Sequence, residues 1–127
     1  MKRRQLLFSI LKGVVLGIGF DQLVHAQEQL DPLEIMPDTH RLLFENEFVR
    51  VIESKVPAGR VEPKHSHPHC VPISLADFEA EITTFPDGKT VRVRRTFGSV
   101  AWSEATVHEV KIVGNAPSHN VRVELNC

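Results

Sequence analysis

The sequence predicts a single all-β domain, a sandwich or a barrel. Short segments rich in β-branched and apolar residues recur at close spacing, and glycine or proline turns separate them. No window shows a sustained helical period. About a hundred residues remain once the N-terminal 26 are set aside, which suits one domain with one modest core.

The N-terminal segment 1–26 has the pattern of a secretory signal peptide. A basic stretch at 2–4 precedes a largely apolar stretch at 6–19, and Val24-His25-Ala26 offers the small residues that a signal peptidase reads. Gln27 is then the expected start of the mature chain. The arginine pair at 3–4 also resembles a twin-arginine signal. We expect a periplasmic or secreted protein; an uncleaved N-terminal anchor is the alternative.

Removal of the signal makes the chain acidic. The full sequence has 15 Lys+Arg and 16 Asp+Glu, and cleavage would leave 11 basic and 15 acidic residues, a net charge of about −4. Such a protein has no electrostatic reason to bind nucleic acid or anionic lipid. We therefore expect neither a nucleic-acid partner nor a membrane partner after cleavage.

The first half of the mature chain leads from an irregular segment into strands. Residues 27–39 are polar and contain two prolines, which predicts an extended lead-in without regular structure. The folded domain is expected to span 40–127. A short apolar run predicts a strand at 41–44, and a segment rich in β-branched residues predicts another at 48–56. A third expected strand, 70–75, follows a cluster of histidines.

The second half contains the strongest hairpin signal. Segments 78–85 and 90–97 both alternate with a period of two and flank the turn Pro86-Asp87-Gly88. The remaining expected strands, each bounded by turn residues, are 99–102, 107–113 and 121–125.

Three of the histidines fall within five residues. His65 and His67 are two apart, so on an extended strand both project from one face and could share one metal ion. His69 has the same parity, but Pro68 breaks a regular strand there. The alternative is a polar loop whose histidines face water.

The spacing around these histidines resembles that of the cupin family. Gly59 stands six residues before the His65-Ser66-His67 motif, and a second glycine, Gly98, precedes His108 by ten residues. The resemblance covers about 40–126. It implies a single-domain cupin-type β-barrel, that is, a jelly roll or double-stranded β-helix.

The resemblance also implies a metal site. His65, His67 and His108 match the imidazole ligands of the family, whereas the family's glutamate would fall near Val71, which cannot ligate. The expected cofactor is a divalent transition metal ion (Fe, Mn, Ni, Cu or Zn) held by three histidines. Such a site leaves coordination positions open, and loss of the carboxylate makes it less suited to hard cations.

Further polar residues are candidates for the same site. His69 is either an additional ligand or a residue at the rim of the barrel. Glu62 and Glu104 are expected near the barrel mouth, as a general base or as solvated turn carboxylates. His40 and His119 are expected at the surface or behind the ligands.

Two other predictions concern packing. Trp102 is expected in the core, with its indole N–H bonded to a carbonyl. Cys70 and Cys127 either pair in an oxidising compartment or stay free, Cys70 half-buried and Cys127 at a frayed terminus.

Two classes of function stay open at this point. The first is an exported metal-dependent cupin acting on a small organic molecule by dioxygenase-, isomerase- or decarboxylase-like chemistry, among which the fold does not choose. The second is a non-catalytic periplasmic cupin that captures a small ligand or a metal. A homodimer formed through sheet edges is a further expectation.

Overall fold

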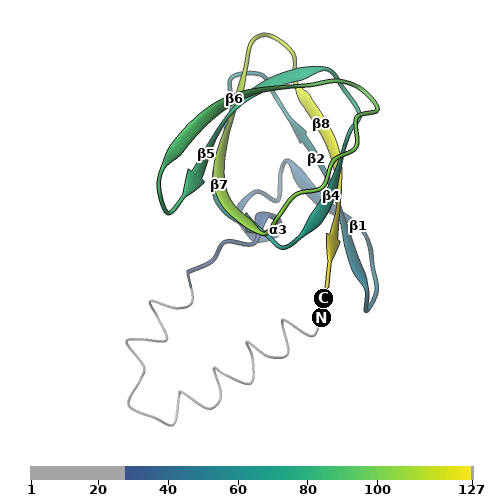
Figure 1. Ribbon diagram of the computed structural model, residues 1–127. Coiled ribbons are helices and arrows are strands. Elements are labelled where there is room, and N and C mark those ends of the chain that lie inside the picture. The colour runs from purple at the N-terminus through teal and green to yellow at the C-terminus, as the bar shows by residue number, and fades with distance from the viewer. Residues whose placement is uncertain (1–27, 127) are drawn as a thin grey trace, which may run out of the picture.

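The computed structural model describes residues 28–126, which form two facing β-sheets (Figure 1). Eight strands make up these sheets in the described part of the chain. They are β1 His40–Glu45, β2 Val49–Val56, β3 Val61–His67, β4 Cys70–Ser74, β5 Phe78–Phe85, β6 Lys89–Arg95, β7 Thr106–Val113 and β8 Ser118–Leu125. The predicted all-β class is confirmed.

Each sheet has four antiparallel strands, in the orders β1-β2-β8-β4 and β3-β7-β5-β6. Strands distant in sequence are neighbours in both sheets: β2 pairs with β8, and β3 pairs with β7. The chain crosses from one sheet to the other between β2 and β3, between β3 and β4, between β4 and β5, and between β7 and β8. This arrangement is a jelly roll, and within the described residues the two sheets are not hydrogen-bonded into one closed barrel.

The predicted hairpin is present as β5 and β6. Its register runs from Phe78 opposite Arg95 to Thr84 opposite Lys89, and Gly88 takes the positive φ of 74° that its turn requires. β5 also pairs along its length with β7. The hairpin therefore continues the sheet that carries the histidine strand β3.

An apolar cluster lies between the sheets. Its buried members come from β2, β5 and β7, and Ile82 and Val93 pack against them. These members are Val56, Phe78, Ala80, Val110 and Ile112. Arg50 on β2 and His108 on β7 have the same parity as the apolar members of their strands, so they also face the interior, where the site lies.

The lead-in is more ordered than predicted. A one-turn helix, α3 Pro32–Ile35, replaces the expected irregular segment. Asp31 caps it by accepting a hydrogen bond from the Leu33 backbone N–H at 3.0 Å, and Pro32 occupies the first turn, where no N–H is needed. Met36, just after the helix, is 2% exposed. Burial of this segment against the sheets stabilises a helix too short to form alone.

The strand expected at 99–102 is absent. This segment meets β4 through two isolated bridges, Ile73 with Val100 and Cys70 with Ser103. Pro72 lies between these bridges on β4 and has no N–H to donate to a continuous ladder. The segment is therefore an irregular cover along the edge of β4.

Some predictions concern residues outside the described range. The signal peptide at 1–26, the mature start at Gln27 and the pairing of Cys70 with Cys127 all depend on such residues. Over residues 28–126, no helix has the length and apolar character needed to cross a membrane.

Candidate metal centre

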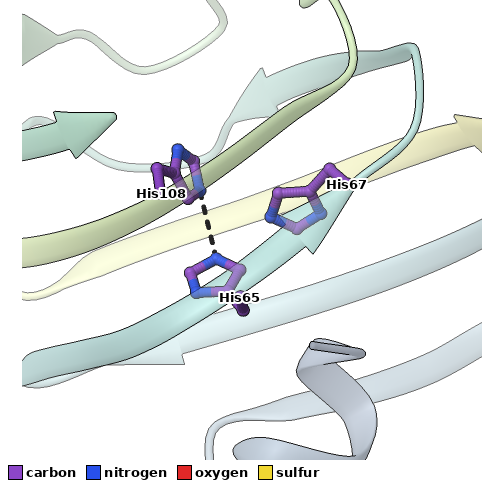
Figure 2. Close-up of side chains that lie close together, drawn as sticks. All are labelled: His65, His67 and His108. Atoms are coloured by element: carbon purple, nitrogen blue, oxygen red, sulfur yellow. Dashed lines mark hydrogen bonds between the residues drawn. The ribbon is translucent and has the colours of Figure 1, made fainter. Parts of the chain in front are cut away.

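β3 and β7 bring the three predicted ligands together. His65 lies directly opposite His108 in the register of these strands, and His67 lies opposite Thr106. All three side chains are buried, and one nitrogen of each lies within 4.8 Å of the others (Figure 2). The predicted strand geometry, with His65 and His67 on one face, is present.

The hydrogen bonds of the rings direct their Nε2 atoms into the cluster. His65 Nδ1 lies 2.7 Å from the Pro63 carbonyl oxygen, so Nδ1–H donates and Nε2 carries the lone pair. His67 Nδ1 likewise donates to Glu124, at 2.8 Å. The Nε2 atoms of His65 and His108 are 3.1 Å apart, a separation that one proton or one cation would bridge (Figure 2).

Burial keeps these imidazoles neutral. It lowers the pKa of His108 to about 3, with the charges of His65 and Arg122 adding to the effect. Burial also lowers the pKa of His65, and it lowers that of His67 well below 6.5. Neutral imidazole is the form that ligates metal ions, so the ligands need no deprotonation near neutral pH.

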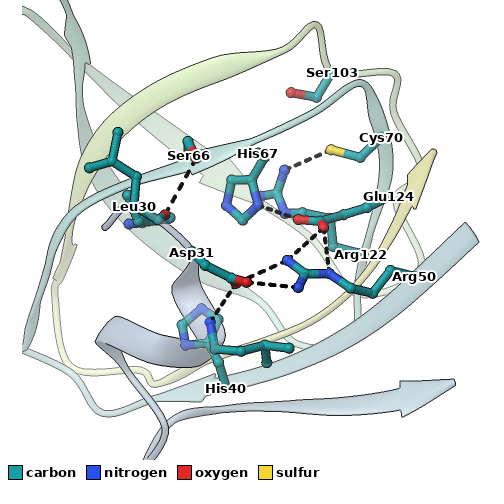
Figure 3. A network of polar contacts seen from close by, with 12 residues as sticks. Leu30, Asp31, His40, Arg50, Ser66, His67, Cys70, Ser103, Arg122 and Glu124 are labelled. Atoms are coloured by element: carbon teal, nitrogen blue, oxygen red, sulfur yellow. Dashed lines mark hydrogen bonds and ion pairs between the residues drawn. The ribbon is translucent and has the colours of Figure 1, made fainter. Parts of the chain in front are cut away.

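A buried ionic network contacts His67 through its Nδ1 atom (Figure 3). Glu124 is fully buried and accepts from His67 and from Arg50 Nε, the latter at 3.0 Å. Arg50 in turn binds both carboxylate oxygens of Asp31, at 2.9 and 3.0 Å. Because a carboxylate acceptor fixes both the tautomer and the orientation of a ligating histidine, Glu124 sets the direction of His67.

The segment before α3 also contacts the histidine strand directly. The backbone N–H of Ser66, between His65 and His67, donates to the Leu30 carbonyl at 2.8 Å. The adjacent residue, Asp31, is the one that binds Arg50. The lead-in is therefore part of the framework that positions the histidines of β3.

A buried carboxylate lies beside the cluster. Glu62 is 8% exposed, and its Oε1 is 3.7 Å from His65 Nε2 and 3.8 Å from His40 Nε2. Glu62 and His65 are three residues apart, so simple alternation would place them on opposite faces. An irregularity in the β3–β7 register between them lets both face inward.

Burial shifts the pKa values of this neighbouring pair in opposite directions. It raises the pKa of Glu62 to about 7 and lowers that of His40 to about 4. Both changes favour the neutral form, as expected for groups removed from water. His40 is buried beside Glu62 and outside the group of three histidines, so it is not at the surface. Glu62 is buried too and is not a solvated turn carboxylate.

A cavity of about 500 Å³ adjoins the cluster, and His67, His108, His40 and Glu62 contribute to its lining. Apolar side chains of β5 and β7 form much of its wall, and Arg122 of β8 adds a positive charge. The apolar members include Phe78, Ala80, Ile82, Val110 and Ile112. A small molecule of moderate polarity would fit this space.

The prediction that Trp102 lies in the core is wrong. Its side chain is 54% exposed, and its indole N–H donates to the Glu104 carboxylate rather than to a carbonyl. The ring stacks on His69, with 5.8 Å between centroids, and His69 Nε2 lies 3.1 Å from Glu104. Trp102 has this position because the irregular cover 99–103 lies along a sheet edge and not between the sheets.

His69 and His119 lie apart from the three ligands. His69 belongs to the exposed group with Trp102 and Glu104, at the rim of the cavity. His119 is partly buried, with its Nε2 2.8 Å from Glu53 Oε2. Neither residue contributes a nitrogen to the group that His65, His67 and His108 form.

Sequence reasoning missed the charged residues of the interior. Arg50, Arg122 and Glu124 alternate with valines on β2 and β8, and none of the three was named as a candidate residue. Asp31 was assigned to an irregular lead-in. Alternation groups Arg122 with Glu124 on one face of β8, but the pairing of Glu124 with Arg50 appears only in the register of the structure.

The donor set fits a divalent transition metal. Three neutral imidazoles with converging nitrogens are a ligand set used by Zn, Fe, Ni and Cu sites in proteins. With three protein ligands, positions on the cavity side stay open to water or substrate. Glu62 supplies a nearby carboxyl group that the motif around Val71 lacks, and a bound metal ion would favour its ionised form.

Comparison with known proteins identifies the fold. No protein-family model matches the sequence, and no curated protein matches it. Among solved structures, a cupin domain from Bordetella pertussis Tohama I is similar at a TM-score of 0.62 and 24% identity, covering 69% of this chain and 92% of that one.

Two further structures support the same fold. A Klebsiella pneumoniae protein with a double-stranded β-helix domain is similar at a TM-score of 0.56 and 20% identity, covering 68% of this chain and 75% of that one. An RmlC-like cupin from Methanocaldococcus jannaschii is similar at 0.53 and 18% identity, covering 68% and 80%. The chain therefore has the cupin fold predicted from its histidine and glycine spacing.

Proposed function

We propose that this cupin-fold protein is exported, holds a divalent transition metal ion through His65, His67 and His108, and acts on a small organic molecule in the adjoining cavity. The convergence of three neutral imidazoles at the wall of a cavity of about 500 Å³ carries the proposal. A structural metal site would be closed by a fourth protein ligand, whereas this one opens towards a space for substrate.

The chain's own residues have distinct parts in this function. Such a metal, when bound, would polarise a substrate oxygen or lower the pKa of a water molecule. Glu62, buried beside His65, is placed to take up or release a proton at its carboxyl group. The apolar wall from β5 and β7 would exclude water from the bound molecule.

Export is proposed from the N-terminal sequence. The basic stretch at 2–4, the apolar stretch at 6–19 and Val24-His25-Ala26 together have the order of a signal peptide. The intact mass of the protein recovered from the periplasm or medium tests this. A mature chain beginning at Gln27 is expected, and a full-length chain retained in the cytoplasm would contradict export.

Manganese provides a test that separates an open catalytic site from closed metal storage. Titration of the metal-free protein with Mn²⁺ would first give the affinity and stoichiometry. Water-proton relaxation would then report whether the bound ion keeps exchangeable water, because a slowly tumbling protein-bound ion with coordinated water relaxes protons more strongly than free Mn²⁺ does.

We expect binding at one equivalent with enhanced relaxation, and loss of both in His65→Ala/His67→Ala. Binding without enhancement would favour the non-catalytic binding protein, since no position would be open to substrate. Failure to bind Mn²⁺, Fe²⁺, Ni²⁺, Cu²⁺ or Zn²⁺ would refute the metal site itself.

Homodimer formation stays a prediction. β1 is an edge strand of its sheet, and Leu42, Leu43 and Phe44 on it are 42%, 45% and 54% exposed. Light scattering coupled to gel filtration would measure the mass in solution. A mass of one chain at micromolar concentration would contradict the prediction.

A further inference from the structure

We propose that the cavity takes a small organic molecule bearing a carboxylate, and that Arg122 binds this carboxylate. The inference deepens the proposed function by naming a substrate class. It rests on that function for the role of the bound molecule, while the binding itself can be measured with or without metal.

Arg122 is a partly buried cation that lines the cavity. It lies on β8, a central strand of its sheet, opposite Ile52 of β2 and Pro72 of β4. Its side chain contributes to the cavity lining together with His67 and His108. A molecule held by Arg122 would therefore occupy the space that adjoins the histidine cluster.

The bonding of Arg122 leaves most of its donors available. Its guanidinium makes one hydrogen bond within residues 28–126, from Nη1 to Cys70 Sγ at 3.1 Å (Figure 3). None of the ion pairs within 4.0 Å among those residues includes Arg122. A guanidinium has five N–H groups, and thiol sulfur is a weak acceptor that brings no full negative charge.

Arg50 offers the contrast within the same sheet. It also points into the interior, from the neighbouring strand β2, yet it binds the carboxylates of both Asp31 and Glu124. Arg122 is less buried than Arg50 and has no carboxylate within 4.0 Å among residues 28–126. A guanidinium partly removed from water gains free energy when it pairs with an anion. An anionic ligand would supply the missing partner.

The surroundings of Arg122 are short of negative charge. Glu124 already accepts hydrogen bonds from His67 and Arg50. Glu62 lies between His40 and His65, with its Oε1 3.8 Å and 3.7 Å from their Nε2 atoms, and no ion pair within 4.0 Å joins it to Arg122. Arg122 lines the same cavity as His40, His67 and His108. A metal ion in the three-histidine site would add further positive charge and strengthen the attraction for an anion.

A carboxylate suits this setting better than a phosphate does. The planar guanidinium fork matches the two oxygens of a carboxylate, and one positive charge neutralises one negative charge. A phosphate dianion requires additional cations or backbone N–H donors, and Arg95, the other arginine of the lining, lies on the exposed edge strand β6. The apolar side chains of β5 and β7 would contact the carbon skeleton of the ligand.

The test uses matched probes of known charge. Benzoate and propionate, each beside its primary amide, and phenylphosphonate would be titrated calorimetrically into the mature protein in low-chloride buffer. Each titration would be performed before and after loading with Zn²⁺. We expect both carboxylates to bind saturably in both states, at least about tenfold more tightly than their amides, because a hydrogen-bonded charge pair is lost in the amide.

Variants assign the binding to Arg122. Arg122→Gln should weaken carboxylate binding at least about tenfold, and Arg122→Lys, which keeps the charge without the fork, should have an intermediate affinity. Arg92→Gln is the matched control for net charge, since Arg92 pairs with Glu79 on the exposed sheet edge and should change affinity less than about twofold. Thermal unfolding of each variant would verify that it is folded.

Several results would overturn the proposal. These are equal binding of carboxylates and amides, tighter binding of phenylphosphonate than of benzoate, unchanged carboxylate binding by folded Arg122→Gln, or no carboxylate binding by the wild type. If the wild type binds carboxylates through Arg122 but takes up no Zn²⁺ or other divalent metal, the carboxylate site stands and the metal-dependent function fails. The two proposals are thus tested separately.

Discussion

His67 donates a hydrogen bond from Nδ1 to Glu124 across 2.8 Å, and both side chains are buried (Figure 3). The two residues are 57 positions apart, on strands of different sheets. Glu124 is also the residue that binds Arg50. One carboxylate therefore links a candidate metal ligand to the ionic network that joins β2, β8 and the lead-in.

Replacing Glu124 should weaken metal binding and the fold together. In Glu124→Gln, His67 loses a charged acceptor and Arg50 loses one of two carboxylates. We expect metal affinity to fall by about 10–100-fold and the free energy of unfolding to fall by about 2–4 kcal/mol. Competition titration with a chelator and urea unfolding would measure the two effects.

Glu53→Gln is the matched control for this change. Glu53 also contacts a histidine and an arginine, His119 and Arg41, but the arginine is 71% exposed and neither belongs to the site. Metal affinity should stay within about twofold of the wild type, because no ligand is touched. Equal losses in the two variants would show that Glu124 has no particular role at His67.

The lead-in should contribute to stability through Asp31. Asp31→Asn removes the charge that Arg50 binds through two hydrogen bonds, and it weakens the cap of α3. We expect the free energy of unfolding to fall by about 1–3 kcal/mol. Asp38→Asn, which affects an exposed pair with Arg60, is the control and should change thermal unfolding much less. Similar unfolding temperatures for both variants would contradict the prediction.

Stability of the metal-free protein should rise with pH. The buried residues His40 and His108 have pKa values of about 4 and about 3, against 6.5 when unfolded, and those of His65 and His67 are lowered too. The unfolded chain therefore binds more protons between about pH 4 and 6.5, so stability is present above this window and is lost as pH falls through it.

Glu62 acts in the opposite direction within this window. Its pKa is raised from 4.5 to about 7, so its contribution decreases as pH rises between these values. Four histidines outweigh one carboxyl group, and we expect unfolding at about pH 7 to require at least about 2 kcal/mol more than at about pH 5. Urea unfolding of chelator-treated protein at both pH values measures this. A flat or inverted dependence would contradict the burial of neutral imidazoles.

Glu62 should strengthen metal binding, because a bound cation would lower the pKa that burial raises to about 7 and so favour the ionised carboxylate. Glu62→Gln keeps the side-chain shape but removes a carboxylate 3.7 Å from His65 Nε2. We expect metal affinity to fall by about tenfold, as measured by chelator competition. Glu109→Gln is the control, because Glu109 adjoins His108 on β7 and alternation turns it away from the cluster. A tenfold loss in both variants would indicate a general effect of net charge.

The candidate ligands were predictable from strand alternation and from the resemblance to the cupin family. Residues two apart on a strand share a face, which placed His65 and His67 together, and the resemblance to the cupin motifs added His108. The inward position of Glu62 was not predictable from alternation. It is three residues before His65, and only a register irregularity, which alternation does not predict, brings it inward.

The interior charges and Trp102 required three-dimensional information. On β8, alternation separates Arg122 and Glu124 from the valines but does not say which set faces the other sheet. Trp102 was expected in the core because it is a large aromatic residue. It lies instead over the edge of β4, where Pro72 prevents full strand pairing. In each case the outcome depended on contacts between segments distant in sequence.

The most direct test of the metal site is the metal content of the protein from its own compartment. Untagged wild-type protein and the variants His65→Ala/His67→Ala and His108→Ala would be measured by inductively coupled plasma mass spectrometry. We expect about one equivalent of iron, manganese, nickel, copper or zinc in the wild type and a loss of at least about 90% in both variants. No metal in the wild type, or equal metal in all three proteins, would contradict a three-histidine metal centre.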